Sequence, residues 1–389
     1  MSVSAPASVA SGERLDPSRL RLFRWIMIAG LVVLLALAVV AAELGARFYE
    51  RHRTTPPDYF PQMYYPHQRL RYGLVPGLDY YGWFRINSLG FRGPEASVAK
   101  KPGVLRVVCL GASTTFDIGS IGAARPWPEV MQEEIRRRLG ADSVEVLNLA
   151  IPGFTSLDSL IDLQIRVLAL QPDLVVVYQG HNDFIYSFPS PYPQRSSLYP
   201  QESTPRSAFM RWIVNHSVLY AKSERPVRQA ISGLWHKVKD GFGAKVPQAD
   251  ADARRDQSLE HGLAEFRSNL TSIAAIARAN DIPLVLPKIV LPFPDDAPTN
   301  CSVCGRLSTV FGNLEPSRVK AMFQRYDSVL VQLAAAGGDI HYIPTDGFVP
   351  KEDRYYHDPI HFGTEGSKLM GERMGAALAP ILSELRRPP

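Results

Sequence analysis

The sequence predicts an α/β fold: a three-layer α/β/α sandwich around a doubly wound, mainly parallel sheet, preceded by one N-terminal transmembrane helix. Three observations lead to this prediction. Short apolar runs rich in β-branched residues alternate with segments of helical length, which is typical of parallel βαβ units with right-handed crossovers. The first run, from Val104, ends abruptly in a small-residue turn, as a buried parallel strand does. An uncharged apolar stretch precedes the alternating region.

The alternating region is expected to contain five strands and five helices. The strands are expected at 105–110, 144–149, 174–178, 283–290 and 340–343. Helical patterns lie at 128–139, 156–170, 259–279, 316–335 and 364–385. With 389 residues, 46% of them hydrophobic, the chain can bury one such core and still carry an anchor and an insertion.

The uncharged stretch covers residues 25–42, and about 18 apolar residues just span a hydrocarbon core of roughly 30 Å. We therefore expect a cytoplasmic tail at 1–24 and a transmembrane helix at 25–42. A cleaved signal peptide is the alternative, because the Val-Ala-Ala that ends at Ala42 resembles a cleavage site. In both cases the rest of the chain is exported. The expected location is the inner membrane, with the main domain in the periplasm or outside the cell.

Two segments flank or interrupt the main domain, which is expected at 102–385. Residues 43–101 are rich in Pro, Tyr, Gly and Arg and are interpreted as a linker and N-terminal extension. The alternation breaks at about 185–257, which indicates an insertion at the carboxyl end of a strand. Such an insertion would overhang the crevice as a lid, or it would form a surface for a partner.

Charge and cysteine content limit the function classes. The net charge of +5 is modest and the basic residues are scattered, so nucleic acid is not predicted as a partner. Cys301 and Cys304 stand in Cys-Ser-Val-Cys, where we expect a short-loop disulfide; a free or redox pair is the alternative. No second ligand pair has zinc spacing, so no metal site is predicted. Cys109, inside the first strand, is expected to be a small buried hydrophobe.

Ser113 is a candidate nucleophile because it follows the first strand, and ligands of open α/β sheets bind outside the strand carboxyl ends. A serine capping the next helix is the alternative. A serine hydroxyl needs an oriented base, and Asp358 and His361 lie three residues apart near the chain end. The carboxylate can reach one imidazole nitrogen while the other faces outward. Ser113, His361 and Asp358 thus make a complete triad.

The order Ser, Asp, His, with the acid three residues before the base, resembles the SGNH, or GDSL-type, hydrolase family, here as a membrane-anchored bacterial member. Four blocks carry the resemblance: Gly111-Ala-Ser113, Asn148 with Gly153, Gly180-His-Asn-Asp183 and Asp358-Pro-Ile-His361. It covers roughly residues 85–183 and 259–385. Ala112 replaces the aspartate of the family's Gly-Asp-Ser. Because the triad acid comes from the last block, the chemistry is unaffected, but assignment to the lipolytic branch is in doubt.

The resemblance implies a flavodoxin-like SGNH fold and a role for each matching residue. Ser113 would attack an ester carbonyl, His361 would take the hydroxyl proton and return it to the leaving alcohol, and Asp358 would orient His361. The backbone amides of Ser113 and Gly153, with the side-chain amide of Asn182, would form the oxyanion hole. Neither a cofactor nor a metal is implied.

Three polar neighbours receive other interpretations. His181 is expected to be a hydrogen-bonding wall residue rather than the base, and His361 is favoured over His357 as the base. Asp183 is expected to accept structural hydrogen bonds from loop amides.

The sequence therefore predicts a membrane-anchored serine esterase or O-deacetylase, acting on an O-acyl ester of an envelope glycan. A lipid ester is the next substrate class. Two other hypotheses stay open: an O-acyltransferase with the same triad, and a non-catalytic glycan-binding assembly protein. The substrate ranking depends on location and family analogy alone.

Overall fold

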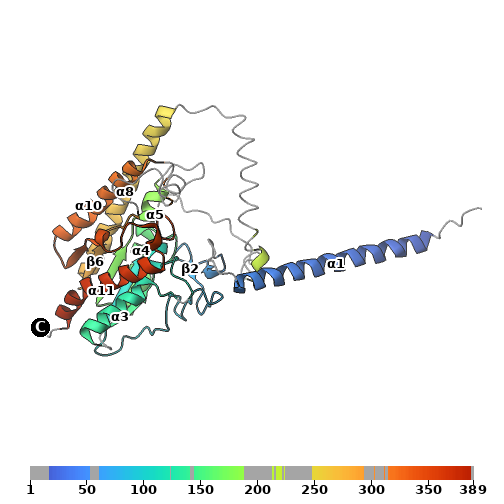
Figure 1. Cartoon of the computed structure of the whole chain (residues 1–389), viewed down its shortest axis with the longest axis horizontal. Coiled ribbons are helices and arrows are strands. Elements are labelled where there is room, and N and C mark those ends of the chain that lie inside the picture. The colour runs from blue at the N-terminus through green and yellow to red at the C-terminus, as the bar shows by residue number, and fades with distance from the viewer. Residues whose placement is uncertain are drawn as a thin grey trace, which may run out of the picture.

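The computed structural model describes residues 17–52, 61–122, 124–140, 144–187, 248–292 and 314–386, and a few residues between these ranges at 213, 216–220, 223, 302 and 311. Figure 1 shows a layered domain from which one long helix projects. The predicted insertion at 185–257 falls mostly outside the described residues. Cys301 and Cys304 also lie outside them.

The centre of the domain is a five-stranded sheet in which every strand pairs parallel with its neighbour, as predicted. Its strands are β3 (Leu105–Gly111), β4 (Val144–Asn148), β5 (Leu174–Tyr178), β6 (Leu284–Pro287) and β7 (Ile340–Ile343). Their order in the sheet is β4-β3-β5-β6-β7. The chain thus moves from β3 to one side and then crosses to the other, which creates a topological switch point beside the carboxyl end of β3.

Helices cover both faces of this sheet (Figure 1). One face carries α3 (Trp127–Leu139) and α11 (Thr364–Leu385), and the other carries α4 (Ser156–Asp162), α8 (Gln248–Ala279) and α10 (Pro316–Ala335). Successive residues of β3 alternate between the two cores: Val108 belongs to one, and Val107 and Cys109 to the other. The three-layer prediction is confirmed, and Cys109 is fully buried as expected.

Three elements differ from the prediction by more than one residue. The strand expected at 283–290 is shorter, covering only Leu284–Pro287. The helix expected at 156–170 is regular only to Asp162 and continues as a π-helix, Leu163–Val167, and a 3₁₀ turn, Leu168–Leu170. Helix α8 begins at Gln248 rather than 259, inside the stretch assigned to the insertion. Alanine and arginine in that stretch are good helix formers, so a polar sequence extends the amphipathic helix.

The N-terminal helix α1 (Pro17–His52) contains the predicted span at 25–42 and is long and apolar enough to cross a membrane. Its apolar side chains are exposed, with none of the most apolar part buried in the domain. By length and composition it is a signal sequence or a single anchor. Beyond the apolar part, the Glu43 carboxylate accepts hydrogen bonds from the backbone N–H groups of Val218 and Leu219, both at 3.0 Å.

The described part of the N-terminal extension, residues 61–101, packs against the end of the domain that carries the β3 turn. It includes the short antiparallel pair β1 (Tyr64–Tyr65) and β2 (Gly73–Leu74). A small apolar core joins the extension to the turn after β3 and to the loop after β4: Met63, Leu70, Leu74, Tyr80, Phe84, Ile86, Phe116, Ala150, Ile151 and Phe154. The extension is therefore built into the domain rather than serving only as a linker.

Candidate active site

Ser113 lies at the switch point of the sheet. Strand β3 ends at Gly111, and Ser113 begins the one-turn helix α2 (Ser113–Phe116). Strand β5, next to β3, ends at Tyr178 and leads through Gly180 into the short helix α5 (His181–Tyr186). The first and third sequence blocks therefore meet at adjacent strand ends, which is where open α/β sheets bind their ligands.

The three predicted triad residues are brought together in hydrogen-bond contact. The Ser113 Oγ lies 2.7 Å from His361 Nε2, although the two residues are 248 positions apart in the chain. On the other side of the ring, His361 Nδ1 lies 2.7 Å from Asp358 Oδ2. Both distances suit a nucleophile–base contact and a base–orienter contact. The arrangement can move a proton from the hydroxyl to an imidazole whose orientation is fixed.

The second oxygen of Asp358 fixes the turn that carries His361. It accepts hydrogen bonds from the backbone N–H groups of Ile360, at 2.8 Å, and His361, at 2.9 Å. Burial acts to raise the pKa of Asp358, but the hydrogen bonds from the His361 ring and from these amides hold it well below its usual range. Asp358 is therefore ionised at neutral pH and can stabilise a protonated His361.

Two of the predicted oxyanion donors are backbone N–H groups, those of Ser113 and Gly153. Ser113 is the first residue of α2, where a helix has no internal acceptor for the N–H. Gly153 stands in the loop after β4 at φ 85°, a conformation that favours glycine. Neither N–H donates to an acceptor among the residues that the structure describes.

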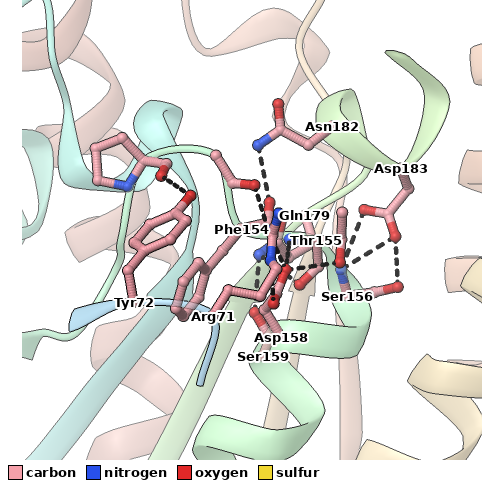
Figure 2. A network of polar contacts seen from close by, with 12 residues as sticks. Arg71, Tyr72, Phe154, Thr155, Ser156, Asp158, Ser159, Gln179, Asn182 and Asp183 are labelled. Atoms are coloured by element: carbon pink, nitrogen blue, oxygen red, sulfur yellow. Dashed lines mark hydrogen bonds and ion pairs between the residues drawn. The ribbon is translucent and has the colours of Figure 1, made fainter. Parts of the chain in front are cut away.

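The third predicted donor, Asn182, comes from α5. Its Nδ2 donates one hydrogen bond, at 2.8 Å, to the carbonyl oxygen of Phe154, next to Gly153 (Figure 2). An amide nitrogen carries two protons, so a second N–H is left for another acceptor. Gly180, which precedes α5, has φ 139°, and this glycine conformation turns the chain from β5 into the helix.

The loop after β4 is held by side chains that the sequence analysis did not single out. Figure 2 shows Tyr72 and Arg71 of the extension reaching this loop and helix α4. The Tyr72 hydroxyl donates to the Pro152 carbonyl oxygen at 2.8 Å. Arg71 donates to the Gly153 carbonyl oxygen at 2.7 Å and, through Nε, to Asp158 Oδ1 at 2.7 Å. Asp158 also accepts the backbone N–H of Thr155 at 2.8 Å, which closes the capping box of α4.

A second arginine of the extension holds the turn that follows Ser113. Arg92 is buried and donates to the carbonyl oxygens of Phe116, at 2.5 Å, Asp117, at 2.7 Å, and Ser120. Burial lowers its pKa to about 10, and it remains charged at neutral pH. Asn148, in the second sequence block, donates to the Thr115 carbonyl oxygen at 2.9 Å. The backbone of α2 is thus fixed from two directions.

Three further polar residues near the triad differ in burial and in their partners. Asp183 accepts hydrogen bonds from the backbone N–H of Ser156 at 3.0 Å and from its hydroxyl at 2.5 Å, in agreement with a structural role. Burial raises the pKa of Asp183 to about 6. His181 is buried against Tyr178 and Phe323, and burial lowers its pKa to about 3, so it is neutral. His357 is exposed, and it is His361 that lies between Ser113 and Asp358.

A comparison with family models identifies the family of the chain. The sequence model described as "GDSL-like Lipase/Acylhydrolase family" matches residues 109–369. A search of curated protein sequences gave no match.

Among the described residues, no group of three or more His, Cys, Asp or Glu side chains is placed to hold a metal ion.

Solved structures with the same general arrangement share little sequence with the chain. A lipase, Lip_vut3, from a goat rumen metagenome is 14% identical, with 70% of this chain and 97% of that one covered and a TM-score of 0.43. A putative GDSL-like lipase from Parabacteroides merdae is 14% identical, with 74% of this chain and 100% of that one covered and a TM-score of 0.40. An acetylxylan esterase, Axe2, from Geobacillus stearothermophilus is 13% identical, with 71% of this chain and 94% of that one covered and a TM-score of 0.40. Similarities of this size say nothing about the substrate.

Proposed function

The chain belongs to the GDSL-like lipase/acylhydrolase family of carboxylic ester hydrolases, and we propose that Ser113 is its nucleophile, His361 its general base and Asp358 the residue that orients the base. The observation that carries this proposal is the unbroken hydrogen-bond chain from Asp358 through His361 to Ser113, with 2.7 Å at both contacts. A hydroxyl in contact with an oriented imidazole is the arrangement that activates serine.

The reaction proceeds by acyl transfer to the serine and then to water. The Ser113 oxygen attacks the ester carbonyl carbon while His361 takes the hydroxyl proton. The negative charge that develops on the carbonyl oxygen is stabilised by the N–H groups of Ser113 and Gly153 and by the second N–H of Asn182. His361 then gives its proton to the leaving alcohol. Water, deprotonated by the same histidine, releases the acid and restores Ser113.

The N-terminal helix limits where the substrate is met. We propose that α1 is an uncleaved anchor, because its apolar side chains are exposed and its Glu43 contacts the Ser217 hydroxyl and the backbone N–H groups of Val218 and Leu219. We also propose that the domain faces the periplasm or the exterior. An enzyme anchored there meets envelope glycans first. An O-acyl group on such a glycan, acetyl above all, is therefore the substrate class that we propose.

Hydrolysis of p-nitrophenyl acetate by the full-length protein in detergent tests the nucleophile and the base. Ser113→Ala and His361→Ala are each expected to lower kcat/KM by at least about 10⁴-fold, because neither residue can act without the other. His357→Ala, an exposed histidine on the same loop, is the matched control and should behave as the parent. Ser113-independent turnover, or equal losses in His357→Ala and His361→Ala, would exclude this triad.

The substrate class is tested with the same protein. Release of acetate from an O-acetylated polysaccharide, with faster turnover of acetyl than of long acyl nitrophenyl esters, is the expected result. Preference for long acyl chains would assign the site to lipid esters. Transfer of acetyl to an added acceptor sugar, with little acetate released, would assign it to the acyltransferase alternative. If cells process the full-length protein to a soluble, active form that lacks residues 1–42, that result would contradict the uncleaved anchor.

A further inference from the structure

Three successive carbonyl groups in the loop after β4 each accept a hydrogen bond from a side chain outside the loop (Figure 2). Tyr72 binds the Pro152 oxygen, Arg71 binds the Gly153 oxygen and Asn182 binds the Phe154 oxygen. Two of these three side chains come from the extension, which lies before the segment, 109–369, that the family match covers.

The Pro152 carbonyl and the Gly153 N–H belong to the same peptide unit. Because a trans peptide is planar, its oxygen and its N–H point in opposite directions, and fixing one fixes the other. Glycine adopts positive and negative φ about equally, so this peptide can rotate unless another group holds it. The Tyr72 hydroxyl, 2.8 Å from the Pro152 oxygen, is such a group. A donor at the carbonyl also polarises the amide and makes its N–H a stronger donor.

The Tyr72 ring is itself fixed in place. It packs against Phe154, with 5.4 Å between ring centroids, and edge-on against Tyr64 at 4.9 Å. The Arg71 guanidinium lies 5.4 Å from the centre of the same ring while it binds the Gly153 carbonyl and Asp158. A methyl group on Gly153 would come within 2.5 Å of the Tyr72 hydroxyl, which shows how closely the two residues approach.

From this geometry we propose that Tyr72 is a positioning residue for the oxyanion hole: its hydroxyl holds the Pro152–Gly153 peptide so that the Gly153 N–H points toward the developing oxyanion. The inference rests on the proposed function, since it assigns a role to that N–H. It adds that part of the site's stabilisation of the transition state originates in the N-terminal extension. Tyr72 does not touch the substrate and acts through the peptide that it binds.

Tyr72→Phe in the full-length protein tests the proposal, because it removes the hydroxyl and leaves the packed ring. Loss of one hydrogen bond of ordinary strength changes a rate constant by about threefold to tenfold. The kcat for p-nitrophenyl acetate should therefore fall by about that factor while KM stays unchanged. Inhibition by a trifluoromethyl ketone, whose adduct with serine carries an oxyanion, should weaken by the same factor. Tyr65→Phe is the matched control: Tyr65 lies in β1, which pairs with the strand that begins directly after Tyr72.

The outcomes separate this inference from the proposed function. A parent whose hydrolysis does not depend on Ser113 overturns both. Serine-dependent activity with equal kcat and equal inhibitor affinity in Tyr72→Phe and Tyr65→Phe overturns the positioning role alone. A Tyr72→Phe variant whose kcat falls in parallel with its folded fraction, measured by circular dichroism, also overturns it, because the hydroxyl would then contribute only to folding.

Discussion

The segment matched by the family and the N-terminal extension contribute different chemistry to one site. The matched segment supplies the groups that we propose to transfer the acyl group and the proton, the hydroxyl of Ser113 and the imidazole of His361, and an oxyanion donor, the amide of Asn182. The extension supplies Arg71 and Tyr72, which donate to backbone carbonyl oxygens of the loop that carries Gly153, and Arg92, which donates to those of the turn that follows Ser113. One segment holds the reacting atoms, and the other holds the backbone beneath them.

This difference shows that the four sequence blocks alone do not supply all the hydrogen-bond donors that the loops of the site require. Loops at strand ends have few ladder hydrogen bonds, so their carbonyl groups need other donors when they are buried. Here cationic and phenolic side chains from a separate segment satisfy them. Substitutions in the matched segment should therefore act on the reaction, whereas substitutions in the extension should act mainly on stability or on donor geometry.

Arg92→Met is expected to have the largest effect on stability. It removes a buried donor from three carbonyl oxygens in the turn after α2, and loss of one partner from a buried charged network costs about 3–5 kcal/mol. The free energy of unfolding, measured with urea, should fall by that amount. Arg85→Met is the matched control: the Arg85 side chain is 70% exposed, and the change should be within about 0.5 kcal/mol. Equal effects of the two variants would contradict the buried role of Arg92.

Asn182→Ala should act in the opposite manner, on the reaction rather than on stability. Loss of one oxyanion donor lowers kcat by about 10²–10³-fold, and the Asn182 side chain is half-buried, so the unfolding free energy should change little. Steady-state kinetics and urea unfolding of the same preparation measure both quantities. Asn280→Ala, at the exposed end of α8, provides the control. A kcat within a factor of three of the parent would remove Asn182 from the oxyanion hole.

Asp183 ties the third block to helix α4 from within the matched segment, and its substitution should produce a pH effect. Its pKa is raised from 3.8 to about 6, so the protonated form is favoured in the folded state. The resulting stabilisation is present below about pH 4 and is lost as pH rises through 6. Asp183→Asn avoids this loss, so its stability relative to the parent should increase by up to about 3 kcal/mol between pH 4 and pH 7. A difference between the urea midpoints of Asp183→Asn and the parent that stays the same from pH 4 to pH 7 would contradict this prediction.

The fold could be predicted closely because its signal is periodic. The strands at 174–178 and 340–343 and the helices at 316–335 and 364–385 have the predicted bounds, since each buries one apolar run or stripe. The helix expected at 156–170 loses its regular geometry after Asp162, although the apolar pattern that predicted it continues to Leu170. The start of α8 was missed because its first turns are polar.

The contacts within the candidate site could be predicted from the sequence only where one functional side chain contacts another. Asp358 and His361 are close in sequence, so their contact followed from spacing, and Ser113 was joined to them by the order of the blocks. Tyr72 and Arg92 bind backbone carbonyl groups, which every residue possesses. Such contacts leave no pattern of residue types in the sequence, and only the fold reveals them.

The acyl-enzyme itself gives the most direct test of the central claim that Ser113 carries the acyl group. The full-length protein would be mixed with p-nitrophenyl acetate, quenched in acid within the first turnover, digested and analysed by mass spectrometry, with Ser113→Ala treated identically. We expect one acetyl group on the peptide that contains Ser113 and none on the corresponding peptide of the variant. Nitrophenol released by the parent without acetylation of Ser113, or an equal burst in Ser113→Ala, would contradict it.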